Sequence, residues 1–359
     1  MSTVVGVFGP TGSGKTEVAV ELARQLGTEI VNADPAQCYV GLPILTNQPT
    51  AEHDAAALHR LIGCWSLRHQ ATVAEFADRA HAEIDALVAA NGHAVVCSGS
   101  GMYLRSALSA MTFGVDAPGD QLPGSAQSSS TDALAASALA SDGGTSPRAD
   151  EQLRAELLAI YNEQGGGVLH AELATLDADV AAAIHPNDQK RLIRALEVAR
   201  RGGSVAAGAG SVWDAPYRHA TTIIGLVTER AVVHTRINAR TRAMFDGGVL
   251  DEVAAAVGEG PGCARLGELS ATAVRIHGLR DCTELLKGHT SREVAIMQLA
   301  TRTRQYARRQ DTWARRWPQL WPVYIDLAAP DFAVTAREVA TLVVGRAHEH
   351  TIAPQEVAR

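Results

Sequence analysis

The sequence predicts an α/β fold, in which helices flank a parallel sheet and a mostly helical subdomain is inserted into the chain. Three observations lead to this prediction. Short β-branched runs alternate with amphipathic helical patterns over the first hundred residues, a glycine-rich loop joins the first run to the first helix, and residues 150–208 show helical periodicity alone. With 359 residues, of which 46% are hydrophobic, the chain is long enough to bury a large core.

The order of the elements supports a parallel sheet, because parallel strands need a crossover connection that is usually a helix. The first expected helix ends before Gly27, a residue type that commonly terminates helices. The expected strands span 3–8, 29–31, 93–97, 221–227 and 323–326, and the expected helices span 17–26, 73–90, most of 232–257 and 292–317.

Changes in composition divide the chain into segments. We expect residues 1–111 and 209–330 to form the α/β core. Residues 112–147 are rich in Gly, Ser and Pro and predict a flexible surface insertion. Residues 148–208 predict a helical insert, and residues 331–359 a C-terminal helix and tail.

Composition also excludes several classes of protein. The absence of a long apolar run argues against a membrane span, and the N-terminus lacks an export signal. Five scattered cysteines without a CxxC pair argue against a disulfide framework and a zinc site. We therefore expect a cytoplasmic protein, a monomer, with no membrane contact and no disulfide partner.

The loop after the first strand has the pattern GxxxxGK[ST], between a strand and a helix as that pattern requires. Its backbone N–H groups and the following helix N-terminus suit a phosphate, which predicts a P-loop NTPase-like core. Lysine supplies a compact positive charge in such a loop, and the last hydroxyl can ligate Mg²⁺. The phosphate-binding residues are Gly9, Pro10, Thr11, Gly12, Ser13, Gly14, Lys15 and Thr16, with Thr16 as the metal ligand.

An aspartate, Asp34, closes the second expected strand, whereas the third ends in Ser98-Gly99-Ser100-Gly101 without an acid. Ligands of such sheets bind at the carboxyl ends of the strands, where Asp34 would face the phosphate loop. A carboxylate there suits proton abstraction. The alternative is that Asp34 merely caps a helix.

Eight collinear segments between residue 9 and about residue 316 resemble the tRNA dimethylallyltransferase family. The most specific of them contain Ile184-His185-Pro186-Asn187-Asp188, within 184–198, and Arg308-Arg309-Gln310-Asp311-Thr312-Trp313, within 306–313. The others are the phosphate loop and the segments at 32–42, 58–62, 98–104, 230–240 and 278–281.

The resemblance implies transfer of a dimethylallyl group from dimethylallyl diphosphate to N6 of adenosine 37, next to the anticodon of a tRNA. The phosphate loop would then hold diphosphate with Mg²⁺, and Asp34 would be the general base. Ser100 and Arg230 match family positions at the diphosphate end or the acceptor site. The target base would have to leave its stack to react.

The resemblance also implies contacts to the anticodon arm, from Pro35, Ala36, Gln37, Gln189, Arg191, Arg309, Gln310 and Trp313. The net charge of −7 hides two arginine-rich segments that would suit a polyanion. Residues 186–242 carry ten Lys/Arg against four Asp/Glu, and residues 301–316 carry six against one.

Structural interpretations compete with these assignments. Arg194, Arg236 and Arg240 are equally well explained as surface charges, and Trp313 as a core residue. The segment His185 to Asp188 is better explained as a helix cap than as catalytic.

Three other functions stay open. The acceptor could be AMP or another small adenine compound, as in cytokinin-type enzymes, or the chain could be a small-molecule kinase that uses ATP. It could also be a tRNA-binding paralogue with weak catalysis, since Pro35 replaces the serine usual after the family's aspartate. Gln48 likewise stands where the family commonly has lysine.

Overall fold

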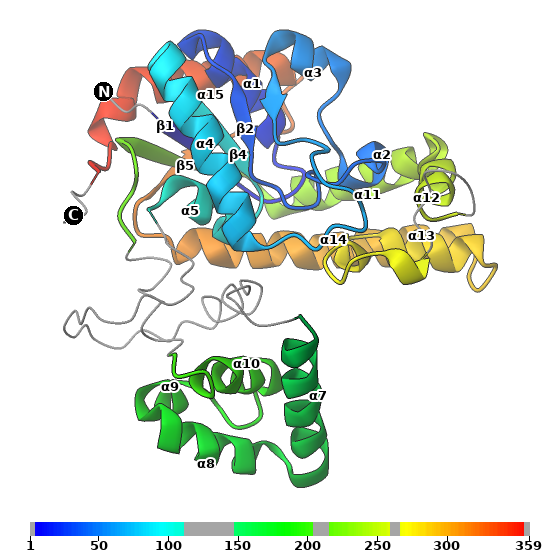
Figure 1. Ribbon diagram of the computed structural model, residues 1–359. Helices are drawn as coiled ribbons and strands as arrows, with labels where there is room; N and C mark the ends of the chain where they lie inside the picture. The colour runs from blue at the N-terminus through cyan, green and yellow to red at the C-terminus, as the bar shows by residue number, and fades with distance from the viewer. Residues whose placement is uncertain (1–3, 111–146, 204–214, 259–265, 355–359) are drawn as a thin grey trace. The chain divides into compact units, whose positions relative to one another are not determined.

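The computed structural model describes residues 4–110, 147–203, 215–258 and 266–354. These residues form two compact units (Figure 1). The first unit comprises Met1–Ala71, Glu75–Ser109 and Pro216–Arg359, and the second comprises Thr72–Ala74 and Ala110–Ala215.

A six-stranded parallel sheet, as far as the described residues show it, forms the centre of the first unit, which confirms the predicted α/β class. The strands lie in the order β3-β2-β4-β1-β5-β6. Their bounds are Val4–Phe8 (β1), Ile30–Asn32 (β2), His59–Arg60 (β3), Ala94–Ser98 (β4), Thr221–Val227 (β5) and Leu320–Tyr324 (β6).

Two strands differ from the prediction. The strand expected at 323–326 begins three residues earlier, at Leu320, and contains Pro322. Proline lacks the N–H of the ladder, but β6 lies at the edge of the sheet and pairs only with β5 there, so one side of it needs no partner. The other edge strand, β3, has two residues and is too short to produce a periodic pattern.

Ten α-helices are described in the first unit. The helix expected over most of 232–257 is divided at Gly248, whose φ of 93° suits glycine and interrupts the helix. The bounds are Lys15–Leu26 (α1), Pro43–Thr46 (α2), Ala51–Ala56 (α3), Val73–Asn91 (α4), Gly101–Leu108 (α5), Arg230–Asp246 (α11), Val249–Val257 (α12), Leu279–Leu286 (α13), Arg292–Arg315 (α14) and Phe332–Arg346 (α15).

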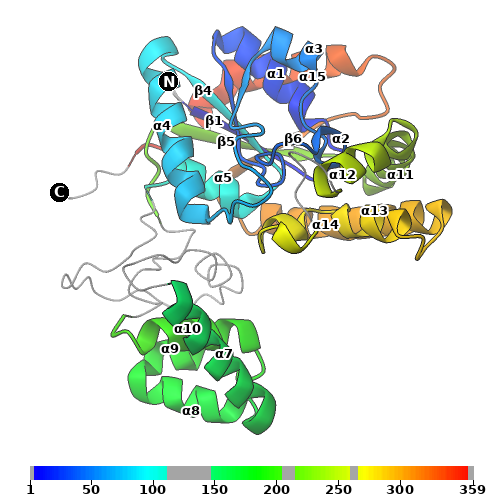
Figure 2. The same cartoon turned by 45° about the vertical axis from the view of Figure 1, so that its right-hand side comes forward.

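Helices cover both faces of the sheet (Figures 1 and 2). The alternation of side chains along β1 builds a core on each face. Val5 and Val7 pack into a cluster with residues of α1 and α15. On the opposite face, a Cβ placed on Gly6 would meet the Leu108 side chain of α5 at 3.0 Å, and Phe8 lies 5.9 Å from the ring of Trp317.

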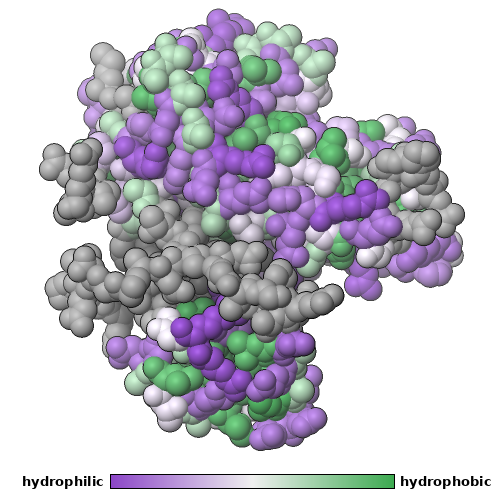
Figure 3. All heavy atoms as spheres, in the orientation of Figure 1, coloured by the Kyte–Doolittle hydropathy of each residue, from purple (hydrophilic) through white to green (hydrophobic). Residues whose placement is uncertain are grey.

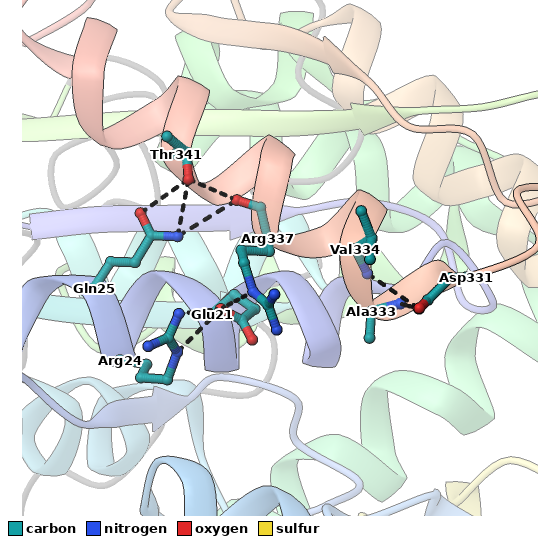
Figure 4. A network of polar contacts seen from close by, with 8 residues as sticks. All are labelled: Glu21, Arg24, Gln25, Asp331, Ala333, Val334, Arg337 and Thr341. Carbon is teal, nitrogen blue, oxygen red and sulfur yellow. Dashed lines mark hydrogen bonds and ion pairs between the residues drawn. The ribbon is translucent and has the colours of Figure 1, made fainter.

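Polar contacts join α15 to α1, the helix that follows the phosphate loop (Figure 4). Gln25 Nε2 donates to Thr341 Oγ1 at 3.2 Å, and Arg337 Nε lies 3.8 Å from Glu21 Oε2. Asp331 caps α15 by accepting two backbone N–H bonds at its start. These contacts attach the end of the described chain to its beginning.

The second unit is helical over its described part, as the periodicity predicts. Its helices are Pro147–Gln164 (α7), Gly166–Leu176 (α8), Ala178–Ala183 (α9) and Gln189–Ala199 (α10). They enclose their own core, in which Leu157, Leu169, Leu173 and Leu192 are fully buried. The insertion expected at 112–147 lies outside the described residues except for Pro147.

Hydrophilic residues predominate on the face shown in Figure 3, with apolar residues in scattered patches between them. In the described part of the chain, no helix combines the length and apolar character that crossing a membrane requires.

Candidate active site

The carboxyl ends of three neighbouring strands bring the predicted site together. Phe8 at the end of β1 pairs with Ser98 at the end of β4, and Asn32 at the end of β2 pairs with Cys97. The Ser98 hydroxyl donates to Ala33 O at 2.6 Å and joins the segments after β2 and β4. The phosphate loop, the Asp34 segment and the Ser98–Gly101 turn therefore follow neighbouring strands at one edge of the sheet.

The phosphate loop adopts a conformation that depends on glycine. Gly12 and Gly14 have φ of 85° and 80°, which other residues rarely adopt, and Gly14 caps α1. Lys15 Nζ folds back and donates to Pro10 O at 2.9 Å. The Ser13 hydroxyl is buried and has no hydrogen-bond partner among the described residues.

Two arginines of α11 contact this loop. Arg240 Nη2 donates to Thr11 Oγ1 at 2.7 Å, and Arg236 Nε donates to Gly12 O at 3.1 Å. Burial lowers the pKa of Arg240, and the charge of Arg236 lowers it further. The structure thus overturns the surface-charge interpretation of both arginines and adds positive charge around the loop.

Gln310 of α14 connects the phosphate loop to the turn after β4. Its Oε1 accepts from the Thr11 backbone N–H at 2.8 Å, and its Nε2 donates to Gly99 O at 2.6 Å. The side chain is buried, and a Cβ on Gly99 would lie 2.4 Å from Nε2. This placement favours a supporting role for Gln310 over the RNA contact that the resemblance implies.

Asp34 begins a tight turn that accommodates the proline after it. The Gln37 N–H donates to Asp34 O at 3.1 Å, so Pro35 occupies the second position of a turn, where proline is favoured. Asp34 Oδ1 accepts from the Ala36 N–H at 3.1 Å, and the Asp34 N–H donates to Asn32 Oδ1 at 3.0 Å. Pro35 therefore breaks none of the hydrogen bonds that form this turn.

Asp34 and the phosphate loop influence each other electrostatically. Burial raises the pKa of Asp34, while the Ala36 hydrogen bond and the charges of Lys15 and Arg240 oppose the rise. Burial lowers the pKa of Lys15, against the opposing effects of Cys97 and Asp34. The site therefore holds a carboxyl with increased proton affinity close to two cations.

Gln37 is held by the segment that follows it. Its Nε2 donates to Thr46 O at 3.3 Å and to Asn47 O at 2.6 Å. Gln48 Nε2 donates to Gln37 O at 3.0 Å and to Tyr39 O at 2.9 Å. The glutamine at the family's lysine position thus closes a loop around Gln37.

The remaining catalytic and metal candidates lie in different settings. The Ser100 N–H donates to Ser98 Oγ at 2.8 Å, directly before α5. Thr16 is the partly exposed second residue of α1.

Arg230 is the exposed first residue of α11. Burial raises the pKa of Asp311 on α14, and the charge of Arg230 opposes that shift. Within the described residues, Arg230 forms no hydrogen bond or ion pair with the phosphate loop.

Trp313 and Arg309 of α14 differ in burial. Trp313 packs against α5, since a Cβ on Gly101 would lie 2.4 Å from Trp313 Cε3. The ring is only half-buried, so Trp313 is not a plain core residue. Arg309 is exposed, and its guanidinium lies 5.7 Å from the ring of Tyr306, which also stacks on His277 at 6.0 Å.

In the second unit, Gln189 and Arg191 lie in the first turn of α10. Asp188 caps that helix by accepting from the Arg191 N–H, and its carboxylate pairs with Arg191 Nε at 3.1 Å. The capping interpretation of Asp188 is confirmed. Arg194 is buried and pairs with Glu197 at 3.3 Å, so the surface-charge interpretation of Arg194 is wrong.

Sequence reasoning did not assign Arg236, Arg240 and Phe332 to the site. A Cβ on Gly14 would lie 2.2 Å from Phe332 Cζ, and the Arg236 guanidinium lies 5.1 Å from the Phe332 ring. The four-residue spacing of the two arginines, which places them on one helix face, was a usable signal. No sequence signal pointed to Phe332, because its position depends on how α15 packs on α1.

Comparisons with known proteins identify the family of this chain. The sequence signature of the IPP transferase family matches residues 37–317. A tRNA dimethylallyltransferase of Anaeromyxobacter dehalogenans is 36% identical over 87% of this chain and 92% of its own. That of Thermobifida fusca is 35% identical over 92% of each chain, and that of Streptomyces coelicolor 34% over 88% of each.

Solved structures show the same fold. The full-length tRNA isopentenylpyrophosphate transferase of Bacillus halodurans superposes with a TM-score of 0.61 at 27% identity, over 98% of both chains. A eukaryotic dimethylallyltransferase acting on tRNA gives a TM-score of 0.71 at 20% identity over 99% of this chain and 82% of its own, which is a likeness of fold. With a family match over most of its length and relatives above 30% identity, the chain belongs to the IPP transferase family and is a prenyltransferase.

Proposed function

We propose that this prenyltransferase moves the dimethylallyl group of dimethylallyl diphosphate to N6 of adenosine 37 in tRNA. The observation that carries the proposal is the pairing of a cationic phosphate loop with the Asp34 carboxyl at one edge of the sheet. The loop suits a diphosphate leaving group, and the carboxyl suits the proton that the acceptor nitrogen must lose.

In the reaction, N6 attacks the allylic carbon, the bond between that carbon and the diphosphate oxygen breaks, and diphosphate departs with both electrons. Lys15, Arg236 and Arg240 supply positive charge around the loop, where negative charge develops. Ser13, whose buried hydroxyl has no partner among the described residues, can donate to the diphosphate. Asp34 accepts the proton from N6, and its raised proton affinity favours that transfer.

We assign Thr16 as the protein ligand of Mg²⁺. Among the described residues, no cluster of three or more His, Cys, Asp or Glu side chains forms a separate metal cage. Mg²⁺ commonly binds through few protein oxygens together with substrate phosphates, and the partly exposed Thr16 beside the loop fits that pattern. When bound, the ion would neutralise charge on the diphosphate.

We assign tRNA recognition to residues in both units. Pro35, Ala36 and Gln37 directly follow Asp34, the proposed general base, in the sequence. They would therefore contact the extruded adenosine. The exposed Arg309 would contact the anticodon arm, with Trp313 and Gln310 shaping the surface from beneath. Gln189 and Arg191, together with the helical second unit, would provide further contacts. We place Ser100 and Arg230 at the diphosphate end or the acceptor site. We also propose that the protein is a cytoplasmic monomer.

The acceptor is tested directly by incubating the full chain with Mg²⁺, dimethylallyl diphosphate and either unmodified tRNA or AMP. We expect N6-prenylated adenosine, detected by mass spectrometry, in the digested tRNA only. Product from AMP alone would overturn the tRNA assignment. Bound tRNA without product on either acceptor would identify a paralogue that has lost catalysis. In a parallel reaction that contains ATP and a small acceptor, ATP consumption would indicate a kinase.

A further inference from the structure

Two cysteines lie on neighbouring backbone segments beside the Asp34 turn. Tyr39 and Trp65 form a parallel β-bridge. The Trp65 N–H donates to Cys38 O, and the Val40 N–H donates to Trp65 O, both at 2.9 Å. Cys38 and Cys64 precede the two bridged residues and are therefore opposite each other in the same register.

The bridge brings the side chains of the two segments close together. The rings of Tyr39 and Trp65 meet edge to face at 5.9 Å on one side of the pair. The two thiols lie close enough to influence each other, since each is the largest cause of the pKa shift of the other. Paired strands lie about 4.8 Å apart, inside the Cα separation of about 4.4–6.8 Å that a disulfide spans.

The two thiols differ in reactivity. Cys38 is buried, whereas Cys64 is partly exposed. The nearby Cys38 thiol, together with the charge of Arg79, lowers the pKa of Cys64, while the nearby Cys64 raises the pKa of Cys38. Burial raises the pKa of Cys97 and of Cys282 to about 12, so these thiols stay protonated.

We propose that Cys38 and Cys64 are a site of reversible oxidation by hydroperoxides, which joins them in a disulfide beside the general base. The Cys64 thiolate attacks the peroxide, the O–O bond breaks, and the departing oxygen takes a proton to leave as water or an alcohol. Cys64 becomes a sulfenic acid. The Cys38 sulfur then attacks Cys64, and hydroxide leaves as water with the Cys38 proton. The disulfide contains two electrons fewer than the two thiols together. The peroxide has gained those two electrons.

The disulfide would disturb the turn that positions Asp34. Cys38 Sγ donates to Asp34 O at 3.6 Å, and Asn32 Nδ2 contacts both Cys38 Sγ at 3.8 Å and Asp34 O at 3.2 Å. Oxidation removes the thiol proton and pulls Cys38 toward Cys64. Since small displacements of catalytic groups reduce rates strongly, prenyl transfer falls. This consequence rests on the proposed function, whereas disulfide formation does not.

The test oxidises the full chain with hydrogen peroxide and maps its peptides under non-reducing conditions. We expect a peptide pair that links Cys38 to Cys64, a loss of prenyl transfer of about tenfold or more, and recovery of both with dithiothreitol. Cys64→Ser is expected to keep the unoxidised activity and to resist peroxide. Cys282→Ala, the matched control, is expected to respond like the native chain.

Two results would overturn the proposal. One is the absence of the linked peptide pair after peroxide treatment, and the other is a linked pair that leaves the transfer rate unchanged. Because the peptide map needs no substrate, it separates a failure of the thiol pair from a failure of the proposed function. If the native chain transfers no prenyl group, the map still decides whether the disulfide forms.

Discussion

At the scale of single residues, the Asp34 carboxyl combines two properties that oppose each other. Its burial suits a proton acceptor, but the same burial makes the charged form costly. An aspartate whose pKa is raised by folding stabilises the fold only when protonated. That contribution is present below the unfolded pKa and is lost as the pH rises through the folded pKa.

Asp34→Asn is therefore expected to lower turnover about a hundredfold or more, since the amide cannot accept the proton. At pH 7 the same substitution is expected to raise the melting temperature, because it removes the cost of a buried charge. This increase in melting temperature should disappear when the pH is below the pKa that aspartate has in the unfolded chain. Steady-state kinetics and thermal melts at several pH values measure both effects.

The exposed aspartate Asp78 of α4 provides the control, since Asp78→Asn should change neither property. Unchanged turnover in Asp34→Asn would remove Asp34 as the general base. A lower melting temperature at pH 7 would contradict the sign of its pKa shift.

Gln310 shows how one side chain can hold two loops, since its amide donates to Gly99 O and accepts from the Thr11 N–H. Gln310→Ala is expected to leave both groups without that partner, which costs about 1–3 kcal/mol in the free energy of unfolding. The KM for dimethylallyl diphosphate should rise more than the KM for tRNA. Denaturant unfolding and kinetics with each substrate varied test this.

Gln305 lies on the same helix and is exposed, so Gln305→Ala is the matched control. A Gln310→Ala variant that weakens only the use of tRNA would instead support direct RNA contact by Gln310.

At the scale of elements, helices far from the phosphate loop in sequence position the parts of the site. Glu252 of α12 accepts from the backbone N–H groups of Ile44 at 2.6 Å and Leu45 at 2.8 Å, at the start of α2. The carbonyls at the end of α2 in turn hold the Gln37 side chain. α12 therefore positions Gln37 through α2.

Glu252→Gln replaces one of the two accepting oxygens with an amide that cannot accept from an N–H. We expect the KM for tRNA to rise about threefold to tenfold, which corresponds to about 0.7–1.4 kcal/mol, the range of one typical hydrogen bond. The KM for dimethylallyl diphosphate should stay unchanged. Asp251→Asn, at the exposed neighbouring position, is the control. Equal increases in both KM values would indicate general loss of structure.

At the scale of the whole molecule, the net charge of −7 is an average over segments of opposite sign. The arginine-rich segment 301–316 falls almost entirely on α14, where Arg302, Arg308, Arg309 and Arg315 are exposed. Such a helix can bind a polyanion despite the acidic total, and binding of this kind releases counterions.

Binding of tRNA is expected to weaken as salt increases, and Arg308→Ala should make the slope of log Kd against log salt shallower by about 0.7. Filter binding or fluorescence anisotropy at several salt concentrations measures the slope. Arg337→Ala on α15, which removes an arginine that lies near Glu21, should leave the slope unchanged. Identical slopes for the native chain and Arg308→Ala would exclude a phosphate contact by Arg308.

Much of this molecule followed from local sequence. The phosphate loop is contiguous, and its glycines and flanking strand and helix determine its conformation over a few residues. The alternation of strands and helices predicted the parallel sheet, and the position of Asp34 after a strand predicted that it would face the loop. These features depend on neighbours in the chain, so the sequence alone was sufficient to find them.

The partners of the loop were decided by the tertiary structure. Thr11 is 299 residues from Gln310 and 229 from Arg240, and Gly14 meets Phe332 near the end of the described chain. No local pattern encodes these contacts, because they depend on the order of the strands and on how α11, α14 and α15 pack. For the same reason, the facing thiols of Cys38 and Cys64 emerge only when the two segments pair.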